Sequence, residues 1–281
     1  MNNQRYLKKL RDTQLEILDY VVTICEKNNL KYSLIGGTLL GAIRHDGYIP
    51  WDDDIDICMP RKDYEKFKKI FPRNEKFILD DYSTNKNYWL PFIKIRNIKT
   101  CYKENIQEKY SGNSGIWIDI FPLDNGNKKI STIEKVQFIF TGIIRTAIAK
   151  KSKMVVGNDK RSKKILINIF IILPKKLLIK IQHKLMVLNK NEESEYLLNL
   201  GSQYGYKKQI HLRKNFFPCK KHLFENRYYY IPKNSDYVLK NIYGNNYMQL
   251  PPIEKRVTHN PIEVTFEDGE NIKFDKKNNK F

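Results

Sequence analysis

The chain has 281 residues, 41% of them hydrophobic and 12% aromatic, so it can bury a full core and is not a disordered chain. It carries 51 Lys and Arg against 31 Asp and Glu, a formal net charge of +20. Four cysteines lie far apart without a C-x-x-C pair, which argues against a disulfide framework and against a zinc site.

The amino terminus and the apolar runs bear on the location of the protein. The amino terminus lacks the apolar stretch of a secretory signal, and the runs VQFIFTGII and ILINIFIIL fall short of the ~20 residues that span a bilayer. We therefore expect a cytoplasmic protein, either free or peripheral at the inner face of the cell membrane.

The first expected elements are a helix, a short strand and a second helix. Apolar residues recur at helical spacing over residues 7–25, and residues 32–35 form a short run typical of a strand. Gly36 and Gly37 break that strand, and residues 38–44 can start a new helix directly after them.

Several strands and one helix follow. Isoleucines alternating with polar residues predict a strand over residues 53–59, and prolines bracket a helix over residues 61–71. Three further strand-like runs cover residues 76–81, 90–101 and 115–121. The sequence therefore predicts an α/β fold with a mixed sheet and a catalytic core over residues 1–125.

The remaining chain divides into two parts by composition. Residues 126–190 form a basic helical region with 16 Lys and Arg against two acids, so the partner of this region should be anionic. Residues 191–281 form a Tyr-rich extension that contains the segment PPIEKRVTH.

The most informative segment is IGGTLLGAIRHDGYIPWDDDIDICMPR. On an extended strand alternate residues share a face, so Asp52, Asp54 and Asp56 can project together while Asp53 and Ile55 point the other way. Three carboxylates on one face repel each other, and Mg²⁺ or Mn²⁺ would relieve that repulsion. A run of acids is usually solvated surface, but the interleaved isoleucines favour a metal site.

The glycine pair before these acids can bind a phosphate. Gly36 and Gly37 let the backbone approach a ligand, and the helix start at Thr38 offers free N–H groups to an anion. Arg44 and His45 can add donors that neutralise charge as a phosphate–oxygen bond breaks. A glycine pair alone usually marks only a turn, so this interpretation depends on the acids that follow.

A fourth acid lies in the apolar run IWIDIF. A buried carboxylate without a partner is costly or becomes protonated, so Asp119 needs a cation or a role in the site. A structural ion pair and a site residue both remain open.

Aromatic and carboxy-terminal residues supply further candidates. Trp51 and Trp89 are the first to test in a cation–π cage for a quaternary ammonium, although most aromatic residues are packing. In the segment LPPIEKRVTH, Arg256 can bind a phosphate and His259 can hydrogen-bond to donor or acceptor. A structural role for these two is equally open.

The order of these motifs resembles the signature of the nucleotidyltransferase superfamily: a glycine pair, a helix, an acid–hydrophobic–acid triplet and a later acid in a strand. More narrowly, GGTLLGAIRHDGYIPWDDDIDICMPRKDYEKF resembles the LicD family of phosphocholine transferases, which is related to the fukutin group of sugar-alcohol phosphate transferases. QLEILDYVVTICEKNNLKY, WIDIFPLD and YGNNYMQLPPIEKRVTH resemble that family too, so the resemblance covers most of the chain except the basic middle.

This resemblance implies a nucleotidyltransferase-like core, an extension over residues 191–281 that completes the active site, and CDP-choline or another CDP-alcohol as donor. Carried across residue by residue, Asp54 and Asp56 would be metal ligands, Asp52 would assist, and Asp119 matches the later acid.

The expected reaction is metal-dependent transfer of phosphocholine, or a similar phospho-alcohol, to a hydroxyl of a cell-surface glycan, teichoic acid or lipopolysaccharide precursor, with release of CMP. Asp119 would act on the acceptor hydroxyl or complete the metal shell. Two alternatives remain: nucleotidyl transfer with release of pyrophosphate, and a non-catalytic membrane-surface scaffold, in which loss of an acid would be expected.

The basic middle, RSKKILINIFIILPKKLLIKIQHKL, mixes aliphatic residues with lysines as an interfacial membrane helix does, broken at Pro174. A core helix with a solvated lysine face is the alternative. Nucleic acid is a weaker partner because no recognised motif accompanies the charge, whereas an anionic acceptor on a lipid carrier would explain both charge and apolar surface.

Overall fold

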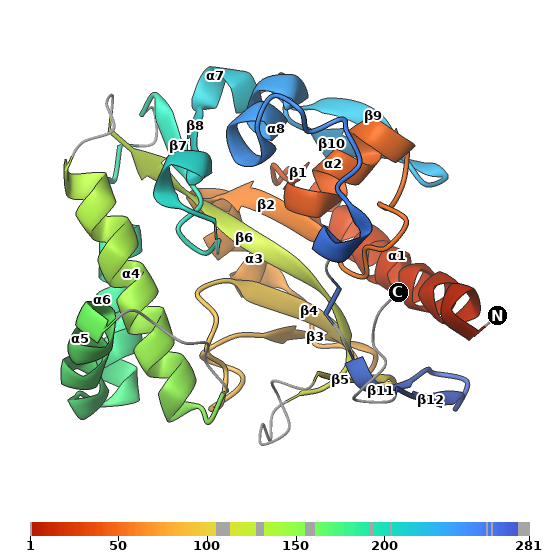
Figure 1. Ribbon diagram of the computed structural model, residues 1–281, viewed down its shortest axis with the longest axis horizontal. Coiled ribbons are helices and arrows are strands. Elements are labelled where there is room, and N and C mark those ends of the chain that lie inside the picture. The colour runs from red at the N-terminus through yellow and green to blue at the C-terminus, as the bar shows by residue number, and fades with distance from the viewer. Residues whose placement is uncertain are drawn as a thin grey trace.

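The computed structural model describes residues 2–104, 113–127, 132–154, 161–191, 194–202, 204–256, 258–259 and 261–274. Figure 1 shows a mixed sheet with one long strand at its centre, and a group of three helices at one end of the molecule. The fold is mixed α/β, as the sequence predicts.

The first part of the chain contains most of the main sheet. Its elements are α1 (Asn2–Lys27), β1 (Ser33–Leu34), α2 (Gly36–His45), β2 (Asp56–Pro60), α3 (Arg61–Ile70), β3 (Phe77–Asp80), β4 (Ile93–Asn97), β5 (Cys101–Glu104) and β6 (Ile116–Gly126). Helices α1 and α3 pack against β6, and α2 packs against β2.

Strand β2 begins at Asp56, later than the sequence predicts. The carbonyl oxygen of Asp52 accepts hydrogen bonds from the Arg11 guanidinium, and that of Asp53 accepts one from the Gln14 amide at 2.8 Å. These carbonyls are therefore held by side chains of α1 and not by a neighbouring strand.

The expected strand over residues 90–101 is also shorter, because a turn separates β4 from β5. The side chain of Asn97 accepts a hydrogen bond from the Lys99 N–H at 2.9 Å, and its carbonyl accepts one from the Thr100 hydroxyl at 2.7 Å. Such local bonds favour a turn over a continued strand.

The strand order of the main sheet is β1-β2-β6-β4-β3. Strand β2 runs parallel to β6, with Asp56 beside Asp119, and β4 runs antiparallel to β6, with Lys94 beside Asp119. The register therefore places two acids and one lysine side by side across the three central strands.

The second part of the chain adds three helices, α4–α6, which we call the helical layer, and then further strands that pair with β6 and β5. Its elements are α4 (Thr132–Lys151), α5 (Arg161–Ile172), α6 (Lys175–Met186), β7 (Tyr196–Leu198), η2 (Tyr206–Gln209), β8 (Ile210–Leu212), α7 (Arg213–Phe216), β9 (Lys220–Phe224), β10 (Arg227–Ile231), α8 (Ser235–Tyr243), η3 (Ile253–Lys255), β11 (Pro261–Thr265) and β12 (Asn271–Lys273). Strand β7 pairs with β6, and β11 pairs with β5.

Three hydrophobic cores hold these parts, and the smallest joins Met186 of α6 to Leu198, Leu200 and Ile210. The largest core joins residues from Tyr6 to Phe266, so the carboxy-terminal extension packs into the same interior as α1 and the sheet. A smaller core lies within α4–α6 and includes Ile144, Ile167 and Leu178. In the part of the chain that the structure describes, no helix is long and apolar enough to span a bilayer.

Candidate active site

The acids of the DDDID segment lie close enough to repel one another. Burial raises the pKa of Asp56 well above its usual value, and the charges of Asp54, Asp119 and Asp52 raise it further. Burial likewise raises the pKa of Asp54 to about 6, against the opposing effect of His259. The pKa of Asp52 is raised by burial and by Asp54. Burial and mutual repulsion therefore disfavour the ionisation of these three carboxyls together.

Asp53, in the same segment, has hydrogen-bond partners of its own. Its carboxylate accepts hydrogen bonds from the Tyr102 hydroxyl at 3.0 Å and from the backbone N–H of His259 at 3.1 Å. The His259 ring nitrogen Nδ1 lies 2.9 Å from the same carboxylate. Asp53 thus ties the carboxy-terminal segment to the loop that carries the other acids.

His259 also lies near the acid cluster, with Nε2 3.7 Å from Asp54 Oδ2. Burial alone would lower the pKa of His259, but the hydrogen bond to Asp53 and the charge of Asp54 raise it well above its usual value. The ring is therefore held as an imidazolium between two aspartates. Its predicted hydrogen bond to donor or acceptor stays a prediction.

The glycine pair is required by the position of the carboxylates. Gly36 has φ +61°, and a Cβ there would lie 2.7 Å from Asp56 Oδ2. A Cβ on Gly37 would lie 2.7 Å from Asp52 Oδ2. The Thr38 hydroxyl accepts a hydrogen bond from the Asp56 N–H at 2.8 Å. The structure therefore brings the start of α2 and the acids together, while phosphate binding there stays a prediction.

Asp119 has a cation partner. Lys94 Nζ lies 2.6 Å from Asp119 Oδ1, and the two side chains are only 8% and 10% exposed. The Lys94 ammonium also lies over the ring of Trp117, 4.3 Å from its centroid. Among the described residues, Asp119 Oδ2 has no hydrogen-bond partner, so one oxygen of this carboxylate is available to a ligand.

Arg44 and His45 lie at the other end of α2 from the glycine pair. The Arg44 guanidinium donates to His45 Nε2 at 3.0 Å and to the carbonyl oxygens of Tyr247 at 2.9 Å and Gln249 at 3.3 Å. Arg44 therefore anchors the carboxy-terminal segment to α2, and the predicted contact of these two residues with a donor stays a prediction.

The two tryptophans singled out in the sequence lie in different places. Trp51 directly precedes the acids, and the Arg256 guanidinium stacks on its ring, 4.3 Å from the centroid. Trp89 packs against the smaller core of the helical layer, and its carbonyl accepts a hydrogen bond from Tyr82 at 3.2 Å. Of the two, only Trp51 adjoins the acid cluster, together with Arg256.

Three residues near the acids were not expected from the sequence. Lys94 had the same signal as Asp119, a charged residue alternating with isoleucines, which could have found it. The rings of Tyr204 and Tyr243 lie 5.8 Å apart. Burial raises the pKa of Tyr204, and the charges of the three cluster aspartates raise it further, so Tyr204 lies near them. No sequence pattern indicated either tyrosine.

The acid cluster has the chemistry of a divalent cation site without a finished ligand shell. In the described part of the chain, no group of three His, Cys, Asp or Glu side chains is already arranged around one point. The donor set is nevertheless all carboxylate oxygen, and burial first, then the charges of neighbouring acids, raises the pKa of each carboxyl. Asp52, Asp54 and Asp56 therefore offer the type of ligand atom, carboxylate oxygen, that Mg²⁺ or Mn²⁺ prefers.

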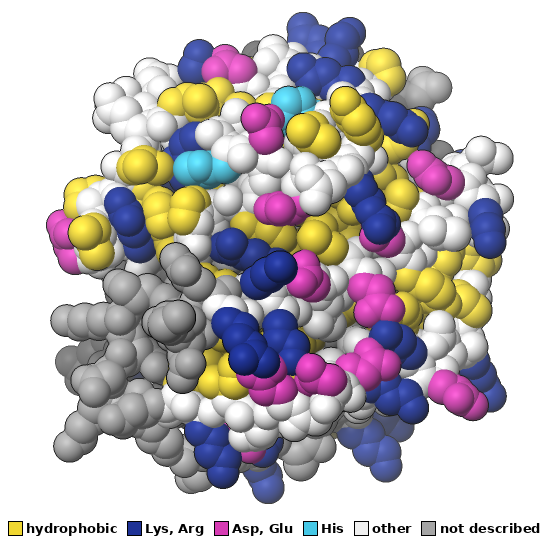
Figure 2. Space-filling view, turned by 90° about the vertical axis from the view of Figure 1, so that its right-hand side faces the viewer, with side chains coloured by type: hydrophobic (Ala, Val, Ile, Leu, Met, Phe, Trp, Pro, Cys, Tyr) yellow, Lys and Arg dark blue, Asp and Glu magenta, His cyan; other side chains and the backbone are white. Residues whose placement is uncertain are grey.

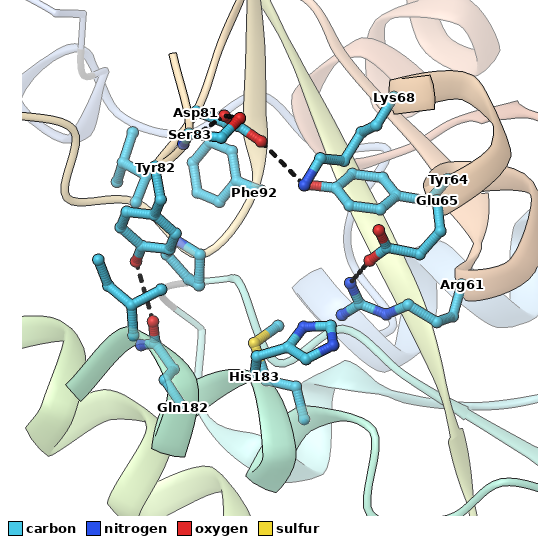
Figure 3. Close-up of a pocket in the computed structure, with 14 residues that line it drawn as sticks. Arg61, Tyr64, Glu65, Lys68, Asp81, Tyr82, Ser83, Phe92, Gln182 and His183 are labelled. Atoms are coloured by element: carbon cyan, nitrogen blue, oxygen red, sulfur yellow. Dashed lines mark hydrogen bonds and ion pairs between the residues drawn. The ribbon is translucent and has the colours of Figure 1, made fainter. Parts of the chain in front are cut away.

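A cavity of about 170 Å³ lies elsewhere, between α3, the β3–β4 connection and α6 (Figure 3). Its charged side chains pair with one another, Lys68 with Asp81 at 2.8 Å and Arg61 with Glu65 at 3.1 Å. None of the predicted site residues lines it. We therefore place the candidate site at the acid cluster and not at this cavity.

Comparison with known proteins identifies the family of the chain. A family described as LicD/FKTN/FKRP, nucleotidyltransferase domain, matches residues 29–142, which include the glycine pair and all four acids. The lipopolysaccharide cholinephosphotransferase LicD of Haemophilus influenzae is 30% identical over 91% of this chain and 97% of that protein. The ribitol 5-phosphate transferase FKRP of Mus musculus is 28% identical over 41% of this chain and 20% of that protein. An uncharacterized protein of Rickettsia prowazekii is 50% identical over 27% of this chain and 26% of that protein.

The similarity to the Haemophilus protein extends over nearly the full length of both chains and therefore well beyond the matched domain. Both named relatives are phosphotransferases. The chain belongs to the LicD family of phosphotransferases.

Proposed function

We propose that this protein transfers phosphocholine, or a similar phospho-alcohol, from a CDP-linked donor to a hydroxyl of a cell-surface glycan precursor and releases CMP. The observation that carries the proposal is the convergence of Asp54, Asp56 and Asp119 beside the start of α2. The named activities of the two phosphotransferase relatives support the class of group transferred.

The acid cluster would hold Mg²⁺ or Mn²⁺, with Asp54 and Asp56 as ligands and Asp52 assisting. Such a cation would neutralise the diphosphate of the donor and polarise the phosphorus under attack. The backbone N–H groups at the start of α2 would bind phosphate oxygens, because a helix amino terminus attracts anions. Trp51 and Arg256 would border the donor on the side of the carboxy-terminal segment.

Asp119 would position the acceptor hydroxyl and take up its proton. The available oxygen Oδ2 supports this role, whereas the ion pair of Oδ1 with Lys94 holds the carboxylate in place. Lys94, fixed within 2.6 Å of Asp119, would also offset negative charge that develops on the transferred phosphoryl group.

The donor and the reaction can be tested together. The purified protein is incubated with Mg²⁺, an acceptor glycan and, in turn, CDP-choline, CDP-ethanolamine, CDP-glycerol and CDP-ribitol. We expect CMP release in step with modification of the acceptor, for one of these donors well above the others. Absence of acceptor-dependent CMP release with every donor would contradict the proposal.

Nucleotidyl transfer is the second candidate, because the matched domain is described as a nucleotidyltransferase domain. It predicts attack on the α-phosphorus of a nucleoside triphosphate and release of pyrophosphate. Assaying pyrophosphate beside CMP separates the two reactions. A non-catalytic scaffold is disfavoured by the retention of Asp52, Asp54, Asp56 and Asp119.

A further inference from the structure

Helix α5 exposes large apolar side chains to solvent along one face. Ile165, Ile169 and Ile172 are 60%, 57% and 82% exposed, and they follow one another at helical spacing. Ile167, on the opposite side of the helix, is fully buried in the smaller core. We name the three exposed residues the isoleucine ridge. Three large aliphatic side chains aligned in water call for a partner surface.

The ridge belongs to the most cationic part of the chain. Residues 126–190 contain 16 Lys and Arg against two acids. On the neighbouring helix α6, Lys176, Lys180 and Lys184 are exposed and recur every four residues, so they form one stripe. Helices α5 and α6 both pack against α4 at the same end of the molecule (Figure 1).

Lys175 does not belong to this stripe, although it is adjacent to Lys176 in the sequence. Its ammonium donates to the carbonyl oxygen of Lys86 and to the Ser152 hydroxyl, both at 2.6 Å. Burial lowers the pKa of Lys175 to about 8. This lysine therefore fixes the start of α6 and is not available to a partner.

Another side of the molecule has a different character. Figure 2 views the side that carries the amino-terminal end of α1, where positive and negative side chains are interspersed. Ion pairs that join α1 and β5 to the carboxy-terminal segment include Lys9 with Glu270 and Lys103 with Glu263, both at 2.6 Å. Such a surface is typical of a face that stays in water.

The chemistry of the helical layer selects one partner. A second copy of this chain would bring two strongly cationic regions together, which repel. A soluble polyanion would satisfy the lysines but leave the isoleucines in water. A bilayer with anionic lipids offers apolar chains for the isoleucines and negative headgroups for the lysines.

We propose that the isoleucine ridge of α5 inserts into the interface of an anionic bilayer, with the lysine stripe of α6 on the lipid headgroups. The contact is monotopic and is independent of the transfer reaction. It would hold the protein at the surface on which a lipid-linked substrate is presented.

The test is sedimentation with vesicles of phosphatidylcholine, with and without phosphatidylglycerol, at low salt. The variant I165S/I169S/I172S removes the ridge and K176Q/K180Q/K184Q removes the stripe. The control I98Q/Y228Q removes two exposed apolar side chains outside the helical layer. Because every changed side chain is exposed, from Ile98 at 45% to Ile172 at 82% among the apolar ones, circular dichroism should show the same fold for all four proteins.

We expect wild type and control to sediment with the anionic vesicles only, and each of the other two variants to lose about tenfold or more in apparent affinity. Wild-type protein that ignores anionic vesicles would overturn the proposal. So would a ridge variant that binds as tightly as wild type. Analytical ultracentrifugation completes the test. If wild type is a dimer and the ridge variant is a monomer, the ridge contacts a second copy of the chain and the proposal is wrong.

Discussion

The central sheet and the helical layer depart from the usual distribution of side chains in opposite ways. In the sheet, charged residues are buried: Lys94 and Asp119 lie on adjacent strands in the interior, and Asp56 lies beside them. In the helical layer, isoleucines of α5 face solvent. Burying charge and exposing aliphatic surface both cost stability. Our proposals give each region a partner that offsets this cost, a divalent cation for the acids and an anionic bilayer for the isoleucines.

Buried charge of two kinds also occurs within the single segment DDDID. Asp53 is buried with hydrogen bonds from Tyr102 and His259. The neighbouring Asp54 and Asp56 repel each other, and their pKa values are raised. Adjacent aspartates should therefore respond to the same substitution with opposite changes in stability.

The largest expected effect is the loss of turnover when an aspartate of the acid cluster is replaced. Asp54→Asn or Asp56→Asn should lower kcat by about 10³-fold or more, because each removes a proposed ligand of the cation. A raised pKa in the folded state means that the ionised carboxylate opposes folding at neutral pH, so the melting temperature should hold or rise. Acceptor-dependent CMP release and thermal unfolding measure the two effects, with the exposed Asp12→Asn as the matched control.

Near-normal turnover of either variant at saturating Mg²⁺ would remove the acid cluster from the reaction. A large drop in melting temperature would instead make these aspartates structural, like Asp53.

Asp119→Asn comes next and concerns the buried ion pair. If Asp119 acts on the acceptor hydroxyl, kcat should fall by about 10²–10⁴-fold, while the Kd of the donor changes little. Calorimetric titration of the donor supplies the Kd. Losses of equal size in rate and donor affinity would place Asp119 in the donor-binding shell.

Asp53→Asn should chiefly affect stability. Asp53 is buried beside His259, so removing its charge should lower the free energy of unfolding by about 2–3 kcal/mol. Denaturant unfolding of this variant beside Asp54→Asn gives the comparison within one segment. Equal free energies of unfolding for the two variants would contradict the division into a structural and a functional aspartate.

The smallest effect is expected in the helical layer. The I165S/I169S/I172S variant should change the free energy of unfolding by no more than about 0.5 kcal/mol, because these side chains are already in water. Its rate on a short soluble acceptor should match that of wild type. A clear loss in either measurement would show that the ridge serves the fold or the active site.

Much of the fold could be predicted from local sequence patterns. The helical period of α1, the glycine pair and the proline before α3 depend on neighbouring residues. Helix α3 begins at the predicted residue, whereas α2 begins at Gly36, within the glycine pair, and α1 begins at Asn2, ahead of the apolar pattern.

Long-range partners were beyond reach of the sequence. The pair of Lys94 with Asp119 depends on the register between two strands, and the contact of Asp53 with His259 joins residues 206 positions apart. The positions of Tyr204 and Trp89 likewise depend on how the helical layer and its connections pack. No local pattern encodes such contacts, whereas spatial packing determines them.

The central claim is that the acids of β2 and its preceding loop form a divalent cation site, and Mn²⁺ binding followed by electron paramagnetic resonance tests it most directly. Wild type and the Asp12→Asn control, each with a CDP-alcohol present, should remove Mn²⁺ from the free signal in proportion to protein. Asp56→Asn should leave Mn²⁺ free over the same range. Equal Mn²⁺ binding by Asp56→Asn and wild type, or no binding by wild type, would contradict the account.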